Sequence, residues 1–336
     1  MAVRMKDIAQ DLGVSLMTIS KALRNHPDIS EGTRKRVLKR IEELNYRPNL
    51  AARALVTGKT YLMGLVVPDL VHPFFSQIAN AISKVLREQR YSLVITSSQE
   101  DPELEQQEID QLLARSVDCL FIASTQTALE SFRRIEDQET PYILLDRKLP
   151  GLAANFIGVD DEQVGFMATK HLIEIGRRRI AHIGTPRVSP ALGRLEGYRR
   201  ALRQYGIRVP AGYVLIRPHG DDAGDATGYD VMKKLLSIRP LPDAVFCHND
   251  PTALGAMKAI LDTGLKIPED IAIVGCGNVK YSDCLRVPLT TIDQDCEAIG
   301  ERAAKLALNL LDSKTPPKPK TILLKPRLVV RDSTRR

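Results

Sequence analysis

The feature that most constrains the fold is a regular alternation, from Thr60 onward, of short apolar runs and longer amphipathic stretches. Apart from His182, the runs contain no strongly polar residue, which is typical of parallel strands covered by helices on both faces. One set lies at 65–67, 93–95, 119–122, 142–145 and 156–159, and a second at 180–183, 214–216, 244–247 and 271–274. We therefore predict an α/β core of two doubly wound parallel-sheet lobes, with a ligand cleft at the carboxyl ends of their strands.

Residues 5–25 predict two short helices joined by a tight turn. Ile8, Ala9 and Leu12 form one apolar stripe, and Gly13 provides the left-handed residue that ends a helix. Ser15 can cap the second helix, which would bury Ile19, Ala22 and Leu23. Its outer face carries Leu16, Met17, Thr18 and Lys21. A helix-turn-helix presents such a face to base edges in the major groove, so we predict base readout by these four residues. The alternative is an ordinary helical hairpin.

The positive charge of the chain is concentrated in this head. Residues 1–60 contain 12 Lys and Arg against 6 Asp and Glu, a net charge of +6, whereas the whole chain carries +7. The remaining 276 residues are therefore nearly neutral, at +1. A compact basic module is what binding to a phosphate backbone requires.

A third helix is predicted from the cap Ser30 to about Leu44. One of its faces is apolar and the other is basic, and Arg34 is our candidate for a phosphate contact from this face. Pro48 then ends the helix, and 47–59 contains a further stretch of helix formers that is too short to be stable alone. We expect a head at 1–46, a hinge-helix linker at 47–59 and the core at 60–336.

Several classes of protein are disfavoured. The first residues lack the apolar segment of a secretory signal, and no stretch approaches the roughly 18 apolar residues of a membrane span. Five scattered cysteines without CxxC spacing favour a reducing cytoplasm over disulfides or a zinc site. The six histidines show no metal-ligand spacing, and there is no Gly-x-Ser-x-Gly or phosphate-loop motif. We expect no catalytic residues, no metal and no cofactor.

Three motifs together resemble the lactose-repressor (LacI/GalR) family of bacterial transcription regulators. They are Asp-Ile-Ala-Gln-Asp-Leu-Gly-Val-Ser-x-x-Thr-Ile-Ser-Lys-Ala-Leu from Asp7, Ser30-x-x-Thr33-Arg34, and Leu44-Asn45-Tyr46-x-Pro48-Asn49. The resemblance implies two heads on a pseudo-palindromic operator, hence a homodimer, with a tetramer as the alternative. It also implies that paired hinge helices enter the minor groove, where Leu55 would be an intercalating wedge flanked by Ala52 and Arg53. We add Ser15, Ser20 and Asn25 to Arg34 as expected backbone contacts.

The resemblance extends to the core, which is similar to periplasmic sugar-binding proteins. It implies a small-molecule effector, a sugar or a related metabolite, between the lobes. The residues that match the family's effector loops are Phe74, Phe75, Asp146, Arg147, Arg194, Asn249 and Asp250. We add Asp160, where the chain should cross between the lobes, and Gln294 as further effector contacts. We expect Arg194 to be the strongest contact and Asp250 to cap the following helix. The implied lobes are 60–158 plus 293–321 and 159–292 plus 322–336.

One departure from the family pattern concerns the loop after 271–274. Many relatives carry Gly-Tyr-Asp-Asp or Gly-Tyr-Asp-Asn, whereas this chain has Gly275-Cys276-Gly277-Asn278, so Gly277 replaces a carboxylate. We predict a cytoplasmic DNA-binding repressor controlled by a small molecule. The loss of this carboxylate leaves open control by a protein corepressor or no ligand control. A solute-binding module that does not bind DNA is the remaining alternative.

Overall fold

The computed structural model describes residues 3–23, 25–46, 58–186, 188–216, 225–313, 315 and 317–335. The chain divides into two compact units, Met1–Thr60 and Tyr61–Arg336. Their internal structures are described separately here. The hinge residues Ala52, Arg53 and Leu55 lie outside the described residues.

The first unit is a three-helix head. Its helices are α1 (Met5–Leu12), α2 (Leu16–Leu23) and α3 (Glu31–Glu43). Gly13 ends α1 in the left-handed conformation at φ 62°, as the sequence predicts. The Ser30 side chain accepts a hydrogen bond from the Thr33 amide and begins α3. Ile8, Ile19 and Val37 form the fully buried centre of this small core.

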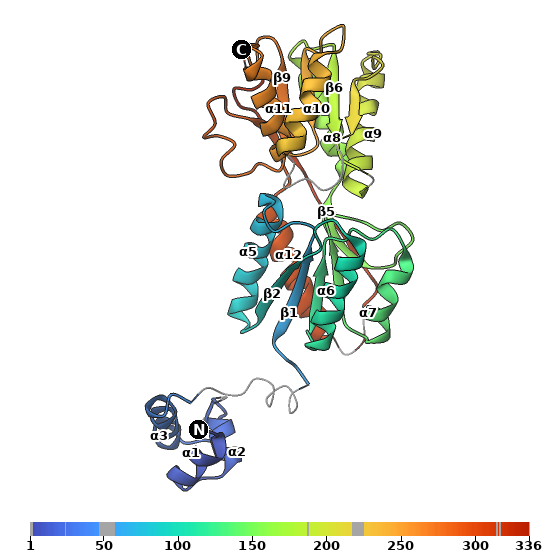
Figure 1. The fold of residues 1–336 in the computed structure, drawn as a ribbon. Coiled ribbons are helices and arrows are strands. Elements are labelled where there is room, and N and C mark those ends of the chain that lie inside the picture. The colour runs from blue at the N-terminus through green and yellow to red at the C-terminus, as the bar shows by residue number, and fades with distance from the viewer. Residues whose placement is uncertain are drawn as a thin grey trace. The chain divides into compact units, whose positions relative to one another are not determined.

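The second unit contains two lobes, each built on a six-stranded sheet (Figure 1). In lobe 1 the strand order is β11-β5-β4-β3-β1-β2, and all neighbours are parallel. The strands are β1 (Leu62–Val67), β2 (Ser92–Ser97), β3 (Cys119–Ile122), β4 (Tyr142–Leu145), β5 (Asn155–Val159) and β11 (Thr321–Leu324). Helices α5 (Pro73–Glu88) and α12 (Cys296–Asp312) cover one face, and α6 (Pro102–Ala114) and α7 (Arg133–Asp137) cover the other (Figure 1).

Lobe 2 repeats this architecture with the order β12-β10-β9-β8-β6-β7. Its strands are β6 (Ile180–Gly184), β7 (Val214–Ile216), β8 (Ala244–Cys247), β9 (Ala272–Cys276), β10 (Thr290–Asp293) and β12 (Arg327–Val329). Helices α8 (Asp161–Glu174) and α9 (Ser189–Gln204) pack on one face, and α10 (Asp225–Leu236) and α11 (Asp250–Asp262) on the other. The edge strand β12 is antiparallel to β10, so the second sheet is not wholly parallel.

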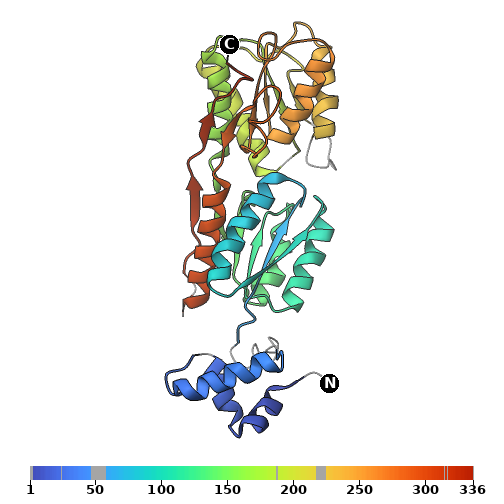
Figure 2. The same cartoon turned by 90° about the vertical axis from the view of Figure 1, so that its left-hand side faces the viewer.

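The chain passes between the lobes three times, after β5, after β10 and after β11. Figure 2 shows the C-terminal segment running from α12 along lobe 1 and on into lobe 2. The expected division placed 322–336 in lobe 2, which is wrong for 322–324. Residues Ile322 and Leu323 pair with Ile157 and Gly158 of β5, so β11 completes the first sheet before the chain crosses.

A buried histidine makes the core sensitive to acid. His182 on β6 stacks against Tyr198 and against Phe246, and its Nδ1 lies 2.9 Å from the Phe246 carbonyl oxygen, to which it donates. Burial lowers the pKa of His182 to about 4, because the charged ring would lose its hydration. The unfolded chain therefore binds this proton at higher pH than the folded chain does, and stability falls as pH drops from about 6.5 toward 4.

We expect His182→Phe to remove this acid-sensitive contribution. From pH 7 to pH 5 the histidine should cost the wild-type core about 2 kcal/mol, which the variant would not lose. Urea unfolding of both chains at the two pH values measures the difference. Protonation of buried carboxyl groups changes the unfolding free energy of both chains with pH in the opposite sense. The difference between the two chains therefore isolates the contribution of His182. Parallel curves for the two chains would contradict the prediction.

Candidate functional site

The start of α2 exposes two large apolar side chains. Leu16 is 48% exposed and Met17 is 60% exposed, although Ile19 on the same helix is fully buried. Ser15 caps the helix, because its Oγ accepts a hydrogen bond from the Thr18 amide at 3.1 Å and lies 2.9 Å from the Thr18 Oγ1. The predicted base-readout face is thus an exposed surface at a helix N-terminus, which suits insertion into a groove.

Lys21 has a partner within the head. Its Nζ donates to the Asp28 Oδ2 at 2.8 Å, and this bond, followed by the charge of His26, lowers the pKa of Asp28. Both side chains are partly exposed. Asp28 therefore orients Lys21 across the turn after α2, and the ammonium group retains further N–H donors for a base.

The arginines of α3 mostly serve the head itself. Arg34 donates through Nη2 to the carbonyl oxygens of His26 and Ile29, at 3.0 and 3.4 Å, and so ties down the preceding loop. Arg36 donates to the Leu12 carbonyl, and Arg40 pairs with Asp11 and Glu43. A hollow of about 620 Å³ opens at the start of α3. Ser30, Gly32, Thr33, Lys35, Arg36 and Lys39 line it. Of the other predicted backbone contacts, Ser20 is half-buried and Asn25 is exposed with φ 56°.

In lobe 1 the predicted aromatic contacts begin α5. Phe74 and Phe75 are 4% and 7% exposed and both belong to the hydrophobic core. Both were predicted as effector contacts. His72, which precedes Pro73, caps the helix, because its ring nitrogen Nδ1 accepts a hydrogen bond from the Phe74 amide at 3.3 Å.

Asp146 and Arg147 follow β4 and are both buried, but Arg147 pairs with a different carboxylate. Arg147 donates to both carboxylate oxygens of Glu100, at 2.8 and 2.6 Å, in a bidentate ion pair. Asp146 takes the left-handed conformation at φ 61°. Burial raises the pKa of Asp146, and the charges of Arg194 and Arg147 oppose that rise. A carboxylate at the end of a buried strand is therefore held close to the arginine of the other lobe.

Arg194 lies on α9 and is almost fully buried. Its Nε donates to the Asp161 Oδ1 at 3.0 Å, and its Nη1 donates to the His248 carbonyl at 2.7 Å. Burial raises the pKa of Asp161 to about 7, opposed by Arg194 and reinforced by Asp146. The neighbouring Asp160, which we predicted as an effector contact, is exposed and caps α8 through the Gln163 amide. The residue that faces the arginine is thus Asp161.

At the start of α11 the capping residue differs from our expectation, which was Asp250. Asn249 is the cap, because its Oδ1 accepts a hydrogen bond from the Thr252 amide at 2.9 Å. Asp250 is fully buried and accepts instead from the Val279 amide, the Ser282 hydroxyl and the Thr291 hydroxyl. The carboxylate of Asp250 is therefore used to hold the loop after β9 and is not directed at an open cleft.

That loop carries the glycine that departs from the family pattern. Gly277 has φ 127°, a conformation that residues with a side chain rarely adopt, so the backbone itself requires glycine here. Next to it, the buried Cys276 Sγ lies 3.4 Å from the Gln294 Oε1.

The two lobes touch at the carboxyl ends of their strands. The Lys148 amide of lobe 1 donates to the Ser189 hydroxyl of lobe 2 at 2.7 Å, and the Nδ2 of Asn249 lies 3.0 Å from the Nε2 of His72. Every predicted effector residue except Asp160 is buried. A hollow of about 270 Å³ beside them includes Asp146, Asp160 and Asp161 in its lining. The two lobes are thus closed on each other at this edge, and a ligand that binds between them would have to break these contacts.

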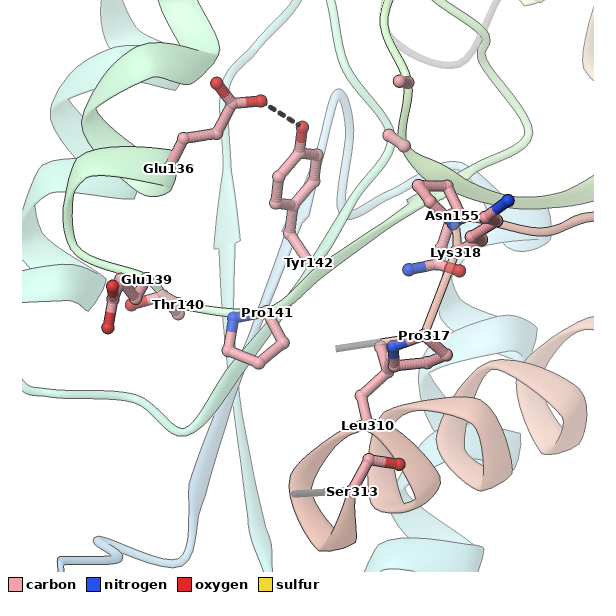
Figure 3. Close-up of a pocket in the computed structure, with 13 residues that line it drawn as sticks. Glu136, Glu139, Thr140, Pro141, Tyr142, Asn155, Leu310, Ser313, Pro317 and Lys318 are labelled. Atoms are coloured by element: carbon pink, nitrogen blue, oxygen red, sulfur yellow. Dashed lines mark hydrogen bonds between the residues drawn. The ribbon is translucent and has the colours of Figure 1, made fainter. Parts of the chain in front are cut away.

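A larger hollow, of about 530 Å³, lies elsewhere on lobe 1 (Figure 3). It lies between the segment from α7 to β4 and the end of α12 with the proline-containing stretch that follows. The hydroxyl of Tyr142 hydrogen-bonds to Glu136 at 3.1 Å on one wall, and Asn155 and Lys318 form another (Figure 3). No predicted effector residue lines this hollow.

Comparisons with known proteins match this architecture. The family model for bacterial regulatory proteins of the lacI family matches residues 4–49, and a periplasmic binding protein-like domain matches residues 169–334. The ribose operon repressor of Escherichia coli (strain K12) is 32% identical over 313 residues, which cover 93% of this chain and 94% of that protein. The chain belongs to the lacI family of bacterial regulatory proteins.

Other proteins similar to this lacI-family regulator support the same assignment. The HTH-type transcriptional repressor PurR of Haemophilus influenzae (strain PittEE) is 32% identical, over 92% of this chain and 91% of that protein. The crystal structure of the lac repressor dimer bound to operator and the anti-inducer ONPF is similar with a TM-score of 0.87 and 28% identity, covering 99% of both chains. The chain is therefore a DNA-binding transcription regulator with an effector-binding core, and these relatives are repressors, not enzymes.

Three residues near the candidate effector site of this lacI-family regulator were not among our predictions: His72, Asp161 and Cys276. A polar residue before a proline-started helix could have indicated His72. Cys276 gave no chemical signal in the sequence. Within the described ranges, no cluster of three His, Cys, Asp or Glu side chains could hold a metal ion. In the same part of the chain, no helix is long and apolar enough to cross a membrane.

Proposed function

We propose that this chain is a cytoplasmic, non-catalytic repressor that binds operator DNA as a homodimer and responds to a neutral, hydroxyl-rich effector. The single observation that carries the DNA part is the exposure of Leu16 and Met17 at the start of α2 in a head of net charge +6. Two neighbouring apolar side chains exposed on this basic head are suited to contact with thymine methyl groups in the major groove. Thr18 and Lys21 would complete the base contacts.

The experiment is selection of the preferred duplex by the full chain, followed by binding measurements on single-base variants of it. We expect Met17→Ser to lose about 1–3 kcal/mol of discrimination, roughly 5- to 150-fold, at one base pair. Binding to random duplexes should be unchanged. A wild-type chain that shows no preference over random DNA would exclude the proposed function.

Lys35→Ala is the matched control for Met17→Ser. Because Arg34 is committed to loop carbonyls, we propose Lys35 and Lys39 as phosphate contacts beside Ser15, Ser20 and Asn25. Removing Lys35 should weaken binding to every duplex alike and reduce the salt dependence by about one counterion. A base-specific loss in this variant would contradict the assignment.

The dimer proposal is supported by an apolar groove on lobe 1. Leu70, Phe75, Ala79 and Ile95 contribute to its lining beside the edge strand β2, and the exposed fractions of Leu70 and Ile95 are 53% and 41%. Edge strands that expose apolar side chains are commonly covered by another chain. A monomer mass for the full chain at micromolar concentration in sedimentation equilibrium would exclude the homodimer.

The effector class follows from the charges at the lobe contact. Asp146 and Asp161 share one guanidinium, that of Arg194, because Arg147 is already paired with Glu100. This excess of carboxyl groups disfavours phosphates and carboxylates and favours hydroxyl groups, which can donate to carboxylates and accept from arginine. Calorimetry with D-ribose first, then other pentoses, hexoses and their phosphates, tests this; tighter binding of a phosphate than of its parent sugar would refute it.

A further inference from the structure

An acidic side chain lies beside the proposed base-readout face of the basic head. Asp28 belongs to the loop between α2 and α3, its side chain is 57% exposed, and its Oδ2 accepts a hydrogen bond from the Lys21 Nζ at 2.8 Å. Lys21 follows the exposed Met17 by four positions on α2, so the two side chains are neighbours on one face of the helix. A carboxylate at this place repels the phosphates of every duplex.

The loop is held without this carboxylate. The Arg34 Nη2 donates to the carbonyl oxygens of His26 and Ile29, and the His26 amide donates to the Lys21 carbonyl at 3.0 Å. The His26 Nδ1 lies 3.4 Å from the Asp28 Oδ2, but it accepts from the Asp28 amide at 3.3 Å and so carries no hydrogen in the neutral ring. An exposed ion pair adds little to stability, so the contact of Asp28 with Lys21 is not explained by folding alone.

The ion pair changes what Lys21 can do. A lysine ammonium is a point charge on a flexible four-carbon stem, and a free one reaches several bases and phosphates. With one N–H directed to Asp28, the group is held in place and keeps two N–H donors. The O6 and N7 atoms of guanine present two acceptors side by side in the major groove.

We propose that Asp28 is a specificity-determining residue, which positions the Lys21 ammonium for one guanine and lowers the affinity for all other DNA by repelling phosphates. A side chain that is already ordered loses less conformational entropy when it binds its target. Specificity is a difference of two affinities, so a residue that weakens non-specific binding can increase it. This inference rests on the proposed function and deepens it, because operator choice then depends on a residue that contacts no base.

The DNA test is Asp28→Asn in the full chain. The duplexes are the selected one, its single-base-pair variants and random sequences. We expect random duplexes to bind more tightly, and discrimination at the base pair affected by Lys21→Ala to fall about three- to tenfold. Discrimination equal to that of wild type would overturn the inference. A loss at a different base pair would make Asp28 a base contact itself and would overturn it as well.

Glu31→Gln is the matched control for charge. Glu31 is exposed in the first turn of α3, three positions after Asp28. Its removal should also tighten binding to random duplexes but should leave base-pair discrimination at the wild-type level. If Glu31→Gln lost as much discrimination as Asp28→Asn, net charge alone would account for the effect and the inference would fail. In a Lys21→Ala background, Asp28→Asn should cause no further loss of discrimination, and an undiminished loss there would also refute the positioning role.

A measurement without DNA tests the positioning directly. Carbon-13 relaxation of the lysine ε-CH₂ groups in the full chain reports their mobility, with the Lys21 signal assigned by its loss in Lys21→Ala. We expect Lys21 to be more ordered than the exposed Lys35 in wild type, and as mobile as Lys35 in Asp28→Asn. Equal mobility of the two lysines in wild type would overturn the inference.

The failure of this inference can be distinguished from failure of the proposed function. A wild-type chain that prefers one duplex, and keeps that preference in full after Asp28→Asn, overturns the role of Asp28 alone. A wild-type chain that prefers no duplex excludes the proposed function and this inference with it.

Discussion

Replacing Gly197 with alanine should destabilise lobe 2 by about 3 kcal/mol or more. A Cβ atom on Gly197 would lie 1.9 Å from the Glu162 carbonyl oxygen and 2.6 Å from the Phe166 amide nitrogen. Both atoms are backbone, so no side chain can move aside, and α8 and α9 would have to separate. On the opposite helix, Gly165 makes an equally close approach to the Arg194 carbonyl.

Urea unfolding of the full chain, followed by circular dichroism, measures the effect of Gly197→Ala. Gly32→Ala is the control, because it is also a helical glycine but a Cβ there would meet nothing within 4 Å. The control should be neutral or stabilising by about 0.5–1 kcal/mol, since alanine has the better helix propensity. Equal unfolding midpoints for Gly197→Ala and wild type would show that the helices are not held at this distance.

Removing the buried guanidinium of Arg194 is the second large perturbation. Arg194→Leu should cost about 3–5 kcal/mol, because it leaves the buried carboxyl groups of Asp161 and Asp146 without their shared cation. The His248 carbonyl would also lose its donor. Arg203→Leu, on the same helix but in an exposed pair with Glu196, should cost no more than about 1 kcal/mol.

The cost of Arg194→Leu should depend on pH in a defined direction. Burial already raises the pKa of Asp161 to about 7, and without the arginine this pKa should rise further. At low pH the carboxyl is neutral and needs no cation, so the deficit relative to wild type should shrink from pH 8 to pH 5. A deficit that does not change with pH would mean that the arginine acts through packing alone. The same variant should lose its response to any effector that releases wild type from DNA.

Local signals in the sequence were enough to predict most of the secondary structure. Gly13 and Ser30 set helix boundaries because their effect depends only on the residues beside them. The apolar runs predicted the strands because strands covered on both faces need no polar alternation.

The functional residues were predictable by position but not by partner. The ion pair between Arg147 and Glu100 joins residues that are 47 positions apart in the sequence. The residues beside Arg147 do not indicate that it pairs with Glu100 and not with Asp146. Similarly, the choice of Asn249 over Asp250 as the cap is decided by Thr291 and Ser282, which draw the carboxylate toward the loop. Such choices depend on tertiary contacts that adjacent residues cannot encode.

The three passages between the lobes have a consequence for synthesis of the protein. Lobe 1 receives α12 and β11 only after nearly all of lobe 2 has been translated, and lobe 2 receives β12 later still. A nascent chain that ends before residue 296 would leave the α5 surface around Ile78 and Ala81, where Gly300 of α12 packs, uncovered. The lobes must therefore mature together late in translation, and premature stops should yield aggregation-prone fragments with neither lobe complete.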